Sequence, residues 1–223
     1  MRPRAVFFDL DDTLIDRAGA FERYLEDLLS RYPSAFARER RNEEVATLRA
    51  LDGRGYTERA LFFRQVTLAF PGLSLTPEAL WEDFAHRLPS FIQPQPGIRA
   101  LVEWVKQHGP VAVVSNGSSR MQRAKLARAG LADVLPDVFL SGEVGASKPD
   151  PRIFSVALAH VGCAPAEVLH VGDDPLRDIA GAAGVGLASC WVSGGRDWPG
   201  EQPPPTFRVS RVEELTQVLS CRT

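Results

Sequence analysis

Cysteine is scarce in this chain of 223 residues, and its copies lie far apart in the sequence. The three are Cys163, Cys190 and Cys221, and no two of them form a C-x-x-C pair. Scattered cysteines argue against a disulfide framework or a zinc site and are typical of small buried residues or exposed thiols. The cytosol is therefore the predicted compartment, and we expect a cytoplasmic protein.

Long apolar runs and long basic runs are also missing. No apolar segment reaches the length that a bilayer requires, and Met1-Arg2-Pro3-Arg4 leads directly into a strand-like run, which argues against a secretory signal. The formal net charge is -2, and no basic stretch is long enough to follow a phosphate backbone. Membranes and nucleic acids are therefore poor candidates as main partners.

Short apolar runs alternate with helical patterns over most of the chain. This alternation predicts an α/β fold, with a doubly wound, mostly parallel sheet that carries helices on both faces. The runs that we predict as strands are Ala5–Leu10, Val111–Ser115, Val138–Leu140, Val168–Gly172 and Leu187–Val192, followed by an edge strand at Thr206–Val209 and a closing helix at Val212–Leu219.

The region from Asp16 to Pro94 breaks the alternation and contains no convincing strand. Apolar residues recur at helical spacing around Phe21–Leu29 and Leu80–Leu88, and Thr76-Pro77 supplies a helix cap and a first-turn proline. Further helices are predicted over Glu39–Leu51 and Tyr56–Phe70. We therefore predict two domains: a core made of residues 1–15 and 95–223, and an inserted all-helical domain of residues 16–94.

Polar residues follow the predicted strands at the point where each one ends. In an open parallel sheet, ligands bind at the carboxyl ends of the strands. The residues that reach this edge are Asp9 and Asp11 after the first strand, Ser115, Asn116 and Gly117 at the second, Lys148 after the third, and Asp173, Asp174 and Asp178 after the fourth. Carboxylates, a hydroxyl, an ammonium group and flexible backbone together suit a phosphoryl group held with a divalent cation.

The acids have distinct tasks in such chemistry. Asp9 and Asp11 repel each other, and a cation between them would relieve that repulsion. Mg²⁺ prefers oxygen ligands and would bridge Asp9, Asp173 and a phosphate oxygen. Asp9 would attack phosphorus and form an aspartyl-phosphate. Asp11 would protonate the departing oxygen and later take a proton from water.

The remaining polar groups would bind the phosphate itself. Lys148 would place a positive charge beside its oxygens. The hydroxyl of Ser115 and the backbone amides of Asn116 and Gly117 would donate hydrogen bonds to the other oxygens. No single group supplies the large barrier reduction that phosphate-monoester hydrolysis needs, so a converging set is expected.

These motifs resemble those of the haloacid dehalogenase superfamily of hydrolases, in the branch with a helical cap after the first strand. The four matching segments are Asp9-Leu10-Asp11-Asp12-Thr13-Leu14, the run that ends in Ser115, Ser147-Lys148-Pro149-Asp150-Pro151, and Gly172-Asp173-Asp174-Pro175-Leu176-Arg177-Asp178. The stretch Ala146–Val192 is similar to the branch that contains pyrimidine 5′-nucleotidases.

The resemblance implies roles for particular residues. By this likeness Asp9 and Asp173 ligate Mg²⁺ through their side chains and Asp11 through its carbonyl. Asp178 matches the final acid of the family, a partner of a metal-bound water or of the lysine, and the role of Asp174 is left open. The implied reaction is hydrolysis of a small phosphorylated metabolite, a nucleoside monophosphate or a sugar phosphate, beneath the cap.

Other functions remain open at this point. A phosphotransferase or phosphomutase would use the same aspartyl-phosphate, whereas dehalogenases of the superfamily carry an aromatic residue where this chain has Asp11. A receiver-type signalling domain is disfavoured by the order of the motifs, and a non-catalytic scaffold by their completeness. Neither substrate nor oligomeric state, monomer or homodimer, follows from the sequence. The histidines, His86, His108, His160 and His170, show no ligand spacing, and His170 is predicted to pack in the core.

Overall fold

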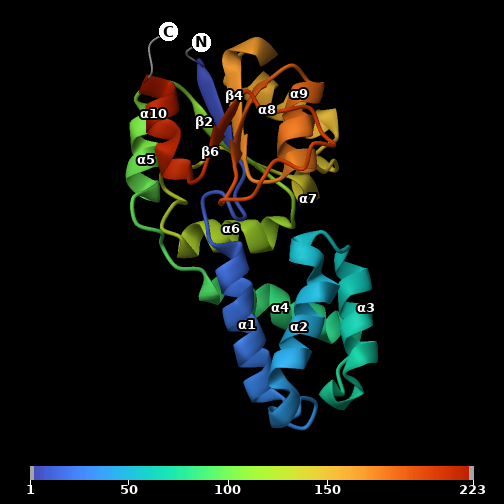
Figure 1. The fold of residues 1–223 in the computed structure, drawn as a ribbon. Helices are drawn as coiled ribbons and strands as arrows, with labels where there is room; N and C mark the ends of the chain where they lie inside the picture. The colour runs from blue at the N-terminus through green and yellow to red at the C-terminus, as the bar shows by residue number, and fades with distance from the viewer. Residues whose placement is uncertain (1–2, 221–223) are drawn as a thin grey trace. The chain divides into compact units, whose positions relative to one another are not determined.

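The fold was obtained as a computed structural model, and it describes residues 3–220 (Figure 1). The chain divides into two units: the first contains the chain up to Asp16 and from Gln93 onward, and the second is Arg17–Ile92. Cys190 is buried and Cys163 is partly buried, whereas Cys221 lies outside the described residues. Within residues 3–220, no helix is both long enough and apolar enough for a membrane crossing.

A six-stranded sheet forms the centre of the first unit, in the order β3-β2-β1-β4-β5-β6. Every neighbouring pair is parallel, which confirms the predicted α/β fold. The strands are β1 Ala5–Phe8, β2 Val111–Ser115, β3 Val138–Leu140, β4 Val168–Gly172, β5 Ala188–Val192 and β6 Phe207–Val209. Strands β2, β3 and β4 have the predicted bounds.

Helices cover both faces of this sheet. Figure 1 shows α5 and α10 on one side and α8 and α9 on the other. This explains why β1, β2 and β4 are buried along their whole length and read as continuous apolar runs. The helices of this unit are α5 Ile98–Lys106, α6 Ser119–Arg128, α7 Ser141–Val144, α8 Pro151–Val161, α9 Gly181–Gly184 and α10 Leu215–Ser220, with the short 3-10 helices η5 Pro165–Glu167 and η7 Val212–Glu214 and the π-helix η6 Pro175–Ala180.

The core of the first unit follows the period of the strands. Phe7 of β1 and Val114 of β2 point to the face on which α8 packs, where Ile153 and Phe154 of that helix meet them. Alternate residues of β1 and β2 therefore contact this helix layer, and the residues between them face the opposite layer.

The first strand is shorter than predicted, because it ends at Phe8 and not at Leu10. The backbone N–H of Asp9 still donates to Val171 O, 2.8 Å away. The carbonyl of Leu10 instead accepts from Leu14 N at 3.0 Å and Ile15 N at 3.1 Å, so the chain coils back on itself. This tight turn follows the strand at once and fixes the backbone around the acids.

The second unit contains helices and no strand between Arg17 and Ile92. Its helices are α1 Arg17–Arg31, α2 Arg41–Asp52, α3 Arg59–Ala69 and α4 Pro77–Arg87, with short turns η1 Arg38–Arg40, η2 Gly53–Gly55, η3 Pro71–Leu73 and η4 Leu88–Phe91. Phe84 packs edge-on against Tyr24 and Phe63, with ring centroids 5.0 and 5.3 Å away. The predicted cap of α4 is confirmed, because Thr76 Oγ1 accepts from Ala79 N at 3.1 Å.

Candidate active site

The strand order reverses beside β1, and this is where the acids gather. Strands β1, β2 and β3 follow one another outward in one direction, whereas β4 returns to the other side of β1. Phe8 pairs with Val171, so Asp9 and Asp173 follow two neighbouring strands at almost the same level. A reversal of this kind is the usual ligand-binding crevice of an open α/β sheet.

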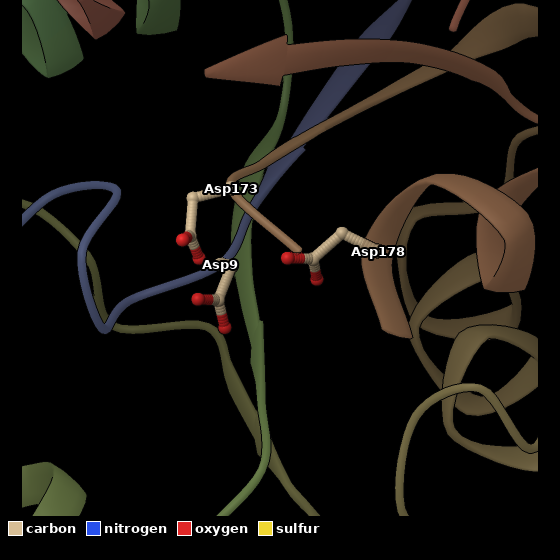
Figure 2. A group of neighbouring side chains, drawn as sticks. All are labelled: Asp9, Asp173 and Asp178. Carbon is tan, nitrogen blue, oxygen red and sulfur yellow. The ribbon is translucent and has the colours of Figure 1, made fainter. Parts of the chain in front are cut away.

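Three carboxylates meet at this crevice. Asp9, Asp173 and Asp178 each offer an oxygen that lies within 4.8 Å of the others (Figure 2). Asp178 comes from η6, which follows β4. Three hard oxygen donors so close together match the ligand preference of Mg²⁺, so the residues fit this ion.

The pKa values of two of these acids are raised, as expected for carboxylates that lack a sufficient counter-charge. Burial, opposed by Lys148 and aided by the charge of Asp178, raises the pKa of Asp9 to about 7. Burial and the charges of Asp178 and Asp9 raise the pKa of Asp173 to about 8. A cation bound between the two acids would favour their ionised forms.

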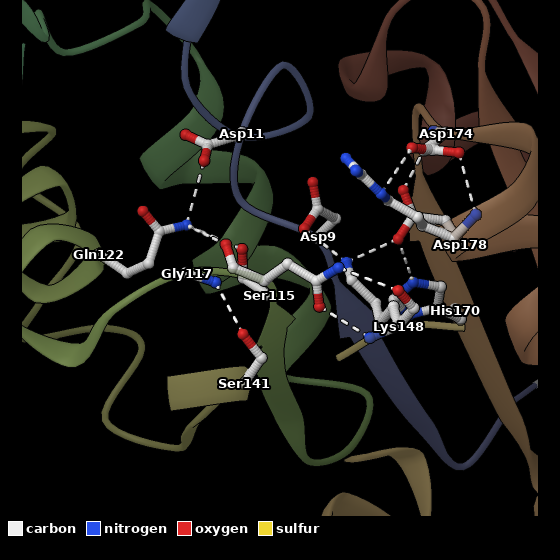
Figure 3. A network of polar contacts seen from close by, with 12 residues as sticks. Asp9, Asp11, Ser115, Gly117, Gln122, Ser141, Lys148, His170, Asp174 and Asp178 are labelled. Carbon is white, nitrogen blue, oxygen red and sulfur yellow. Dashed lines mark hydrogen bonds and ion pairs between the residues drawn. The ribbon is translucent and has the colours of Figure 1, made fainter. Parts of the chain in front are cut away.

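Lys148 contacts two of the three acids. Its Nζ lies 2.6 Å from Asp9 Oδ1 and 2.6 Å from Asp178 Oδ1 (Figure 3), with a side chain that is only 2% exposed. Burial disfavours the ammonium form, but the charges of Asp178 and Asp9 outweigh it and raise the pKa of Lys148. Asn116 fixes the backbone here, because its Oδ1 accepts from Lys148 N at 2.7 Å and its Nδ2 donates to Lys148 O at 3.0 Å.

Asp178 is the most completely bonded acid of the cluster. Its Oδ1 lies 3.0 Å from His170 Nε2, and its Oδ2 accepts from Asp174 N at 3.0 Å. Burial alone would raise its pKa, but Lys148 and His170 hold that pKa below the ordinary value. A side chain at Gly172 would collide with Asp178, so the close approach of this acid to β4 requires glycine.

The second acid of the first motif has its own partners on α6. Lys125 Nζ lies 2.8 Å from Asp11 Oδ1 and 2.7 Å from Asp11 Oδ2. Gln122 Nε2 donates to Asp11 Oδ2 at 3.1 Å and to Ser115 Oγ at 2.9 Å (Figure 3). Because the hydroxyl of Ser115 accepts this bond, its own proton stays available to donate to a ligand.

Two residues of the predicted site have other partners in the structure. The amide of Gly117 donates to Ser141 Oγ at 2.9 Å, so it would have to exchange this bond to reach a phosphate. Asp174 Oδ1 accepts from Leu176 N and Arg177 N, both at 2.9 Å, and so caps η6.

Four polar residues of this network did not emerge as site residues from the sequence. They are Gln122, Lys125, His170 and Arg196. His170 is buried, as predicted for a core residue, but it contacts Asp178. Arg196 Nη2 donates to Asp173 Oδ2 at 3.0 Å and to Asp173 O at 2.9 Å. In the sequence, only His170 could have been noticed, because it is a lone imidazole in an otherwise apolar strand. No comparable pattern distinguishes Gln122, Lys125 or Arg196.

Known proteins match both the sequence and the fold. A family model described as haloacid dehalogenase-like hydrolase matches residues 3–186. Pyrimidine 5′-nucleotidase YjjG of Escherichia coli is 34% identical over 148 residues, and the match spans 66% of this chain and 66% of that protein. Glyceraldehyde 3-phosphate phosphatase of Methanothermobacter thermautotrophicus is 30% identical over 193 residues, 85% of each chain.

A solved structure supports the fold over the whole length. The HAD-hydrolase YfnB of Bacillus subtilis superposes with a TM-score of 0.82 at 23% identity, covering 99% of this chain and 100% of that one. The family match covers most of the chain and includes all the motif segments that suggested the resemblance. The chain therefore belongs to the haloacid dehalogenase-like hydrolase family.

Proposed function

We propose that the protein is a Mg²⁺-dependent phosphatase that hydrolyses a small phosphomonoester through an aspartyl-phosphate on Asp9. One observation carries this proposal. Acids, a hydroxyl and an ammonium group from segments far apart in the sequence lie together at the strand reversal. Lys148 bonds to Asp9 and Asp178, Asp173 has an oxygen within 4.8 Å of oxygens of those two acids, and Asp11 and Ser115 share the amide of Gln122. The named phosphatases among the relatives are consistent with this assignment.

Asp9 is the nucleophile in this reaction. Its carboxylate oxygen attacks phosphorus, the bond from phosphorus to the ester oxygen breaks, and Asp11 gives its proton to the departing oxygen. Water then attacks phosphorus, Asp11 takes one of its protons, and inorganic phosphate leaves while the carboxylate of Asp9 is restored. Both steps need Asp9 and Asp11 to be oriented independently. Each acid has its own lysine partner, since Lys148 contacts Asp9 and Lys125 contacts Asp11.

The remaining groups hold the charges. Asp9 and Asp173 would hold Mg²⁺ by their side chains and Asp11 by its carbonyl, and the ion would neutralise the doubly negative phosphate against the nucleophile. Lys148 places its charge beside the same oxygens, and the proton of Ser115 is donated to one of them. Asp178 fixes Lys148 through the contact at 2.6 Å.

The substrate is a small phosphorylated metabolite of the nucleoside monophosphate or sugar phosphate class. The two named relatives act on substrates of these kinds, as their names state. By the family resemblance, the helical unit Arg17–Ile92 would serve as the cap that selects the substrate. Asp11 disfavours dehalogenation, because breaking a carbon–halogen bond needs no acid for the departing halide.

The test is hydrolysis of para-nitrophenyl phosphate with Mg²⁺, followed by a panel of nucleoside monophosphates and sugar phosphates. Asp9→Asn and a chelator should each abolish turnover, whereas Asp133→Asn, which alters an exposed partner of Arg99, should leave it intact. Full activity of Asp9→Asn would refute the mechanism. Analysis of products with added sugars separates hydrolysis from phosphate transfer, since only hydrolysis releases all the phosphate to water.

A further inference from the structure

Two buried polar side chains of α6 converge on Asp11. The side chain of Lys125 is 4% exposed, and its Nζ contacts both oxygens of the Asp11 carboxylate. Gln122 is 1% exposed and donates to Asp11, to Ser115 Oγ and, at 3.2 Å, to Asn116 O. Burying an ammonium group is costly unless it is paired, so its place beside Asp11 is a specific feature of this site.

The choice of lysine at this position supports a dedicated role. The chain contains three lysines against 23 arginines, and two of the three, Lys125 and Lys148, contact acids of the site. Lysine offers a compact point charge, whereas arginine brings a wide planar fork. Asp9 is paired with Lys148 and Asp11 with Lys125, so two acids only two positions apart are held by different cations.

The side chain of Gln122 is itself fixed by the backbone. A Cβ at Gly117 would lie 2.9 Å from both Cγ and Cδ of Gln122, so only glycine leaves room for the amide to bridge the site. Gly117 has φ +142°, a conformation that other residues rarely adopt. Figure 3 shows Asp11 directed toward Gln122 while Asp9 lies beside Lys148.

We propose that Lys125 and Gln122 are positioning residues that orient the carboxyl of Asp11 for proton transfer to the departing oxygen. This inference rests on the proposed phosphatase function. Neither residue is needed to attack phosphorus, so their loss should resemble the loss of Asp11 and not that of Asp9. The effect should be large for alkyl phosphates, whose alkoxide leaves only when protonated, and small for para-nitrophenyl phosphate, whose phenolate leaves unaided.

The experiment compares kcat/KM for glycerol 2-phosphate and para-nitrophenyl phosphate. Asp11→Asn should lose about 100-fold or more on the alkyl ester. Lys125→Met and Gln122→Leu should each lose at least about tenfold more on the alkyl ester than on the aryl ester. Arg123→Met is the matched control on the same helix, because its partner Glu143 lies in an exposed ion pair, and it should show no such preference.

A double variant tests the path through Asp11. In the Asp11→Asn background, Lys125→Met should cause no further loss on the alkyl ester, because the group that it orients is already gone. Equal losses on both esters, or additive losses in the double variant, would overturn this inference while the phosphatase function stands. Failure of the unmodified protein to hydrolyse either ester would instead overturn the proposed function. Gln122→Leu carries no charge change and keeps the test valid should Lys125→Met fold poorly.

Discussion

Replacing Lys148 by methionine should destabilise the metal-free protein by about 3–4 kcal/mol at pH 7. Methionine keeps most of the length and volume of the side chain but removes its ammonium group. In the native structure that group lies 2.6 Å from Asp9 Oδ1 and 2.6 Å from Asp178 Oδ1, in a place that water barely reaches. The variant leaves Asp178, which Lys148 and His170 keep ionised in the native structure, as a buried carboxylate without this cation.

Two arguments give the size of the loss. The first is that removing one partner of a buried ion pair leaves an uncompensated charge and costs about 3–5 kcal/mol. Here the charge left is that of Asp178, whose Oδ1 lies 2.6 Å from Lys148 Nζ and whose side chain is 1% exposed. The second is that the variant can avoid this uncompensated charge by binding a proton to Asp178. For a carboxyl group with an ordinary pKa, that costs about 4 kcal/mol at pH 7 and about 1.4 kcal/mol less for each pH unit below 7.

The second argument makes the loss depend on pH. In the variant, the freed carboxyl has a pKa above its value in the unfolded chain, so the folded state binds the extra proton. Such a group favours folding at low pH and loses this contribution as pH rises through its folded pKa. The deficit should therefore shrink from about 3–4 kcal/mol at pH 7 to about 1–2 kcal/mol at pH 5.

Denaturant unfolding in the presence of a chelator measures this difference. A Trp81→Phe background removes the tryptophan of the helical unit, so that fluorescence reports on the first unit through the tryptophans Trp104, Trp191 and Trp198. Lys106→Met is the control, because Lys106 Nζ donates to the backbone oxygen of Val134 at 2.8 Å, and it should lose about 1 kcal/mol at both pH values. Equal losses for Lys148→Met at pH 5 and pH 7 would refute the electrostatic reasoning.

Three further predictions follow from the other charged groups. Arg196→Met should weaken activation by Mg²⁺ about tenfold in a titration of activity, with kcat unchanged at saturation, because Arg196 orients Asp173. The metal-free protein should lose stability between pH 6.5 and pH 8.5, because the raised pKa values of Asp9 and Asp173 make the folded state bind more protons than the unfolded chain. With saturating Mg²⁺, the melting temperature should change less over the same pH range. Asp52→Ala should destabilise the helical unit by about 3–5 kcal/mol in circular dichroism melts, because it leaves the buried Arg17 without this partner, 2.7 Å away.

Each of these predictions has an outcome that would contradict it, and the two substitutions also have control variants. Arg211→Met breaks an exposed pair with Glu213 and should leave the Mg²⁺ titration unchanged. An equal shift in both arginine variants would contradict the positioning of Asp173. Stability that rises from pH 6.5 to 8.5 without metal would contradict the pKa directions. Glu22→Ala breaks an exposed pair with Arg49 and should cost about 0–1 kcal/mol. If Asp52→Ala cost no more than this, burial would not explain the importance of the Arg17–Asp52 pair.

The fold and the strand-end residues could be predicted because short-range patterns encode them. Apolar runs buried on both faces mark parallel strands, and in such a sheet the next few residues must reach the carboxyl edge. That reasoning found Asp9, Ser115 and Asp173 without knowledge of the contacts between strands. It extended the first strand by two residues, because the turn after Phe8 depends on hydrogen bonds to the carbonyl of Leu10 that no apolar pattern reveals.

The partners of the acids could not be predicted, because they lie on elements whose position depends on packing. Gln122 and Lys125 are three positions apart on α6 and look like ordinary polar helix residues in the sequence. They become part of the site only because this face of α6 is buried against the turn that carries Asp11. Arg196 follows β5 in a loop without a motif, and its contact with Asp173 depends on how that loop folds back toward β4.

The pKa directions show where the site needs a cation. Burial tends to raise the pKa of all three clustered acids, but Lys148 and His170 reverse this for Asp178, which stays ionised. The same burial raises the pKa of Asp9 and Asp173 to about 7 and 8, because the surrounding cations do not balance their charge. A divalent ion between these two acids would lower both values. Under the proposed mechanism it would then neutralise the incoming phosphate and keep more of Asp9 in the ionised form that attacks phosphorus, so loss of the metal should deplete the nucleophile as well as remove the positive charge.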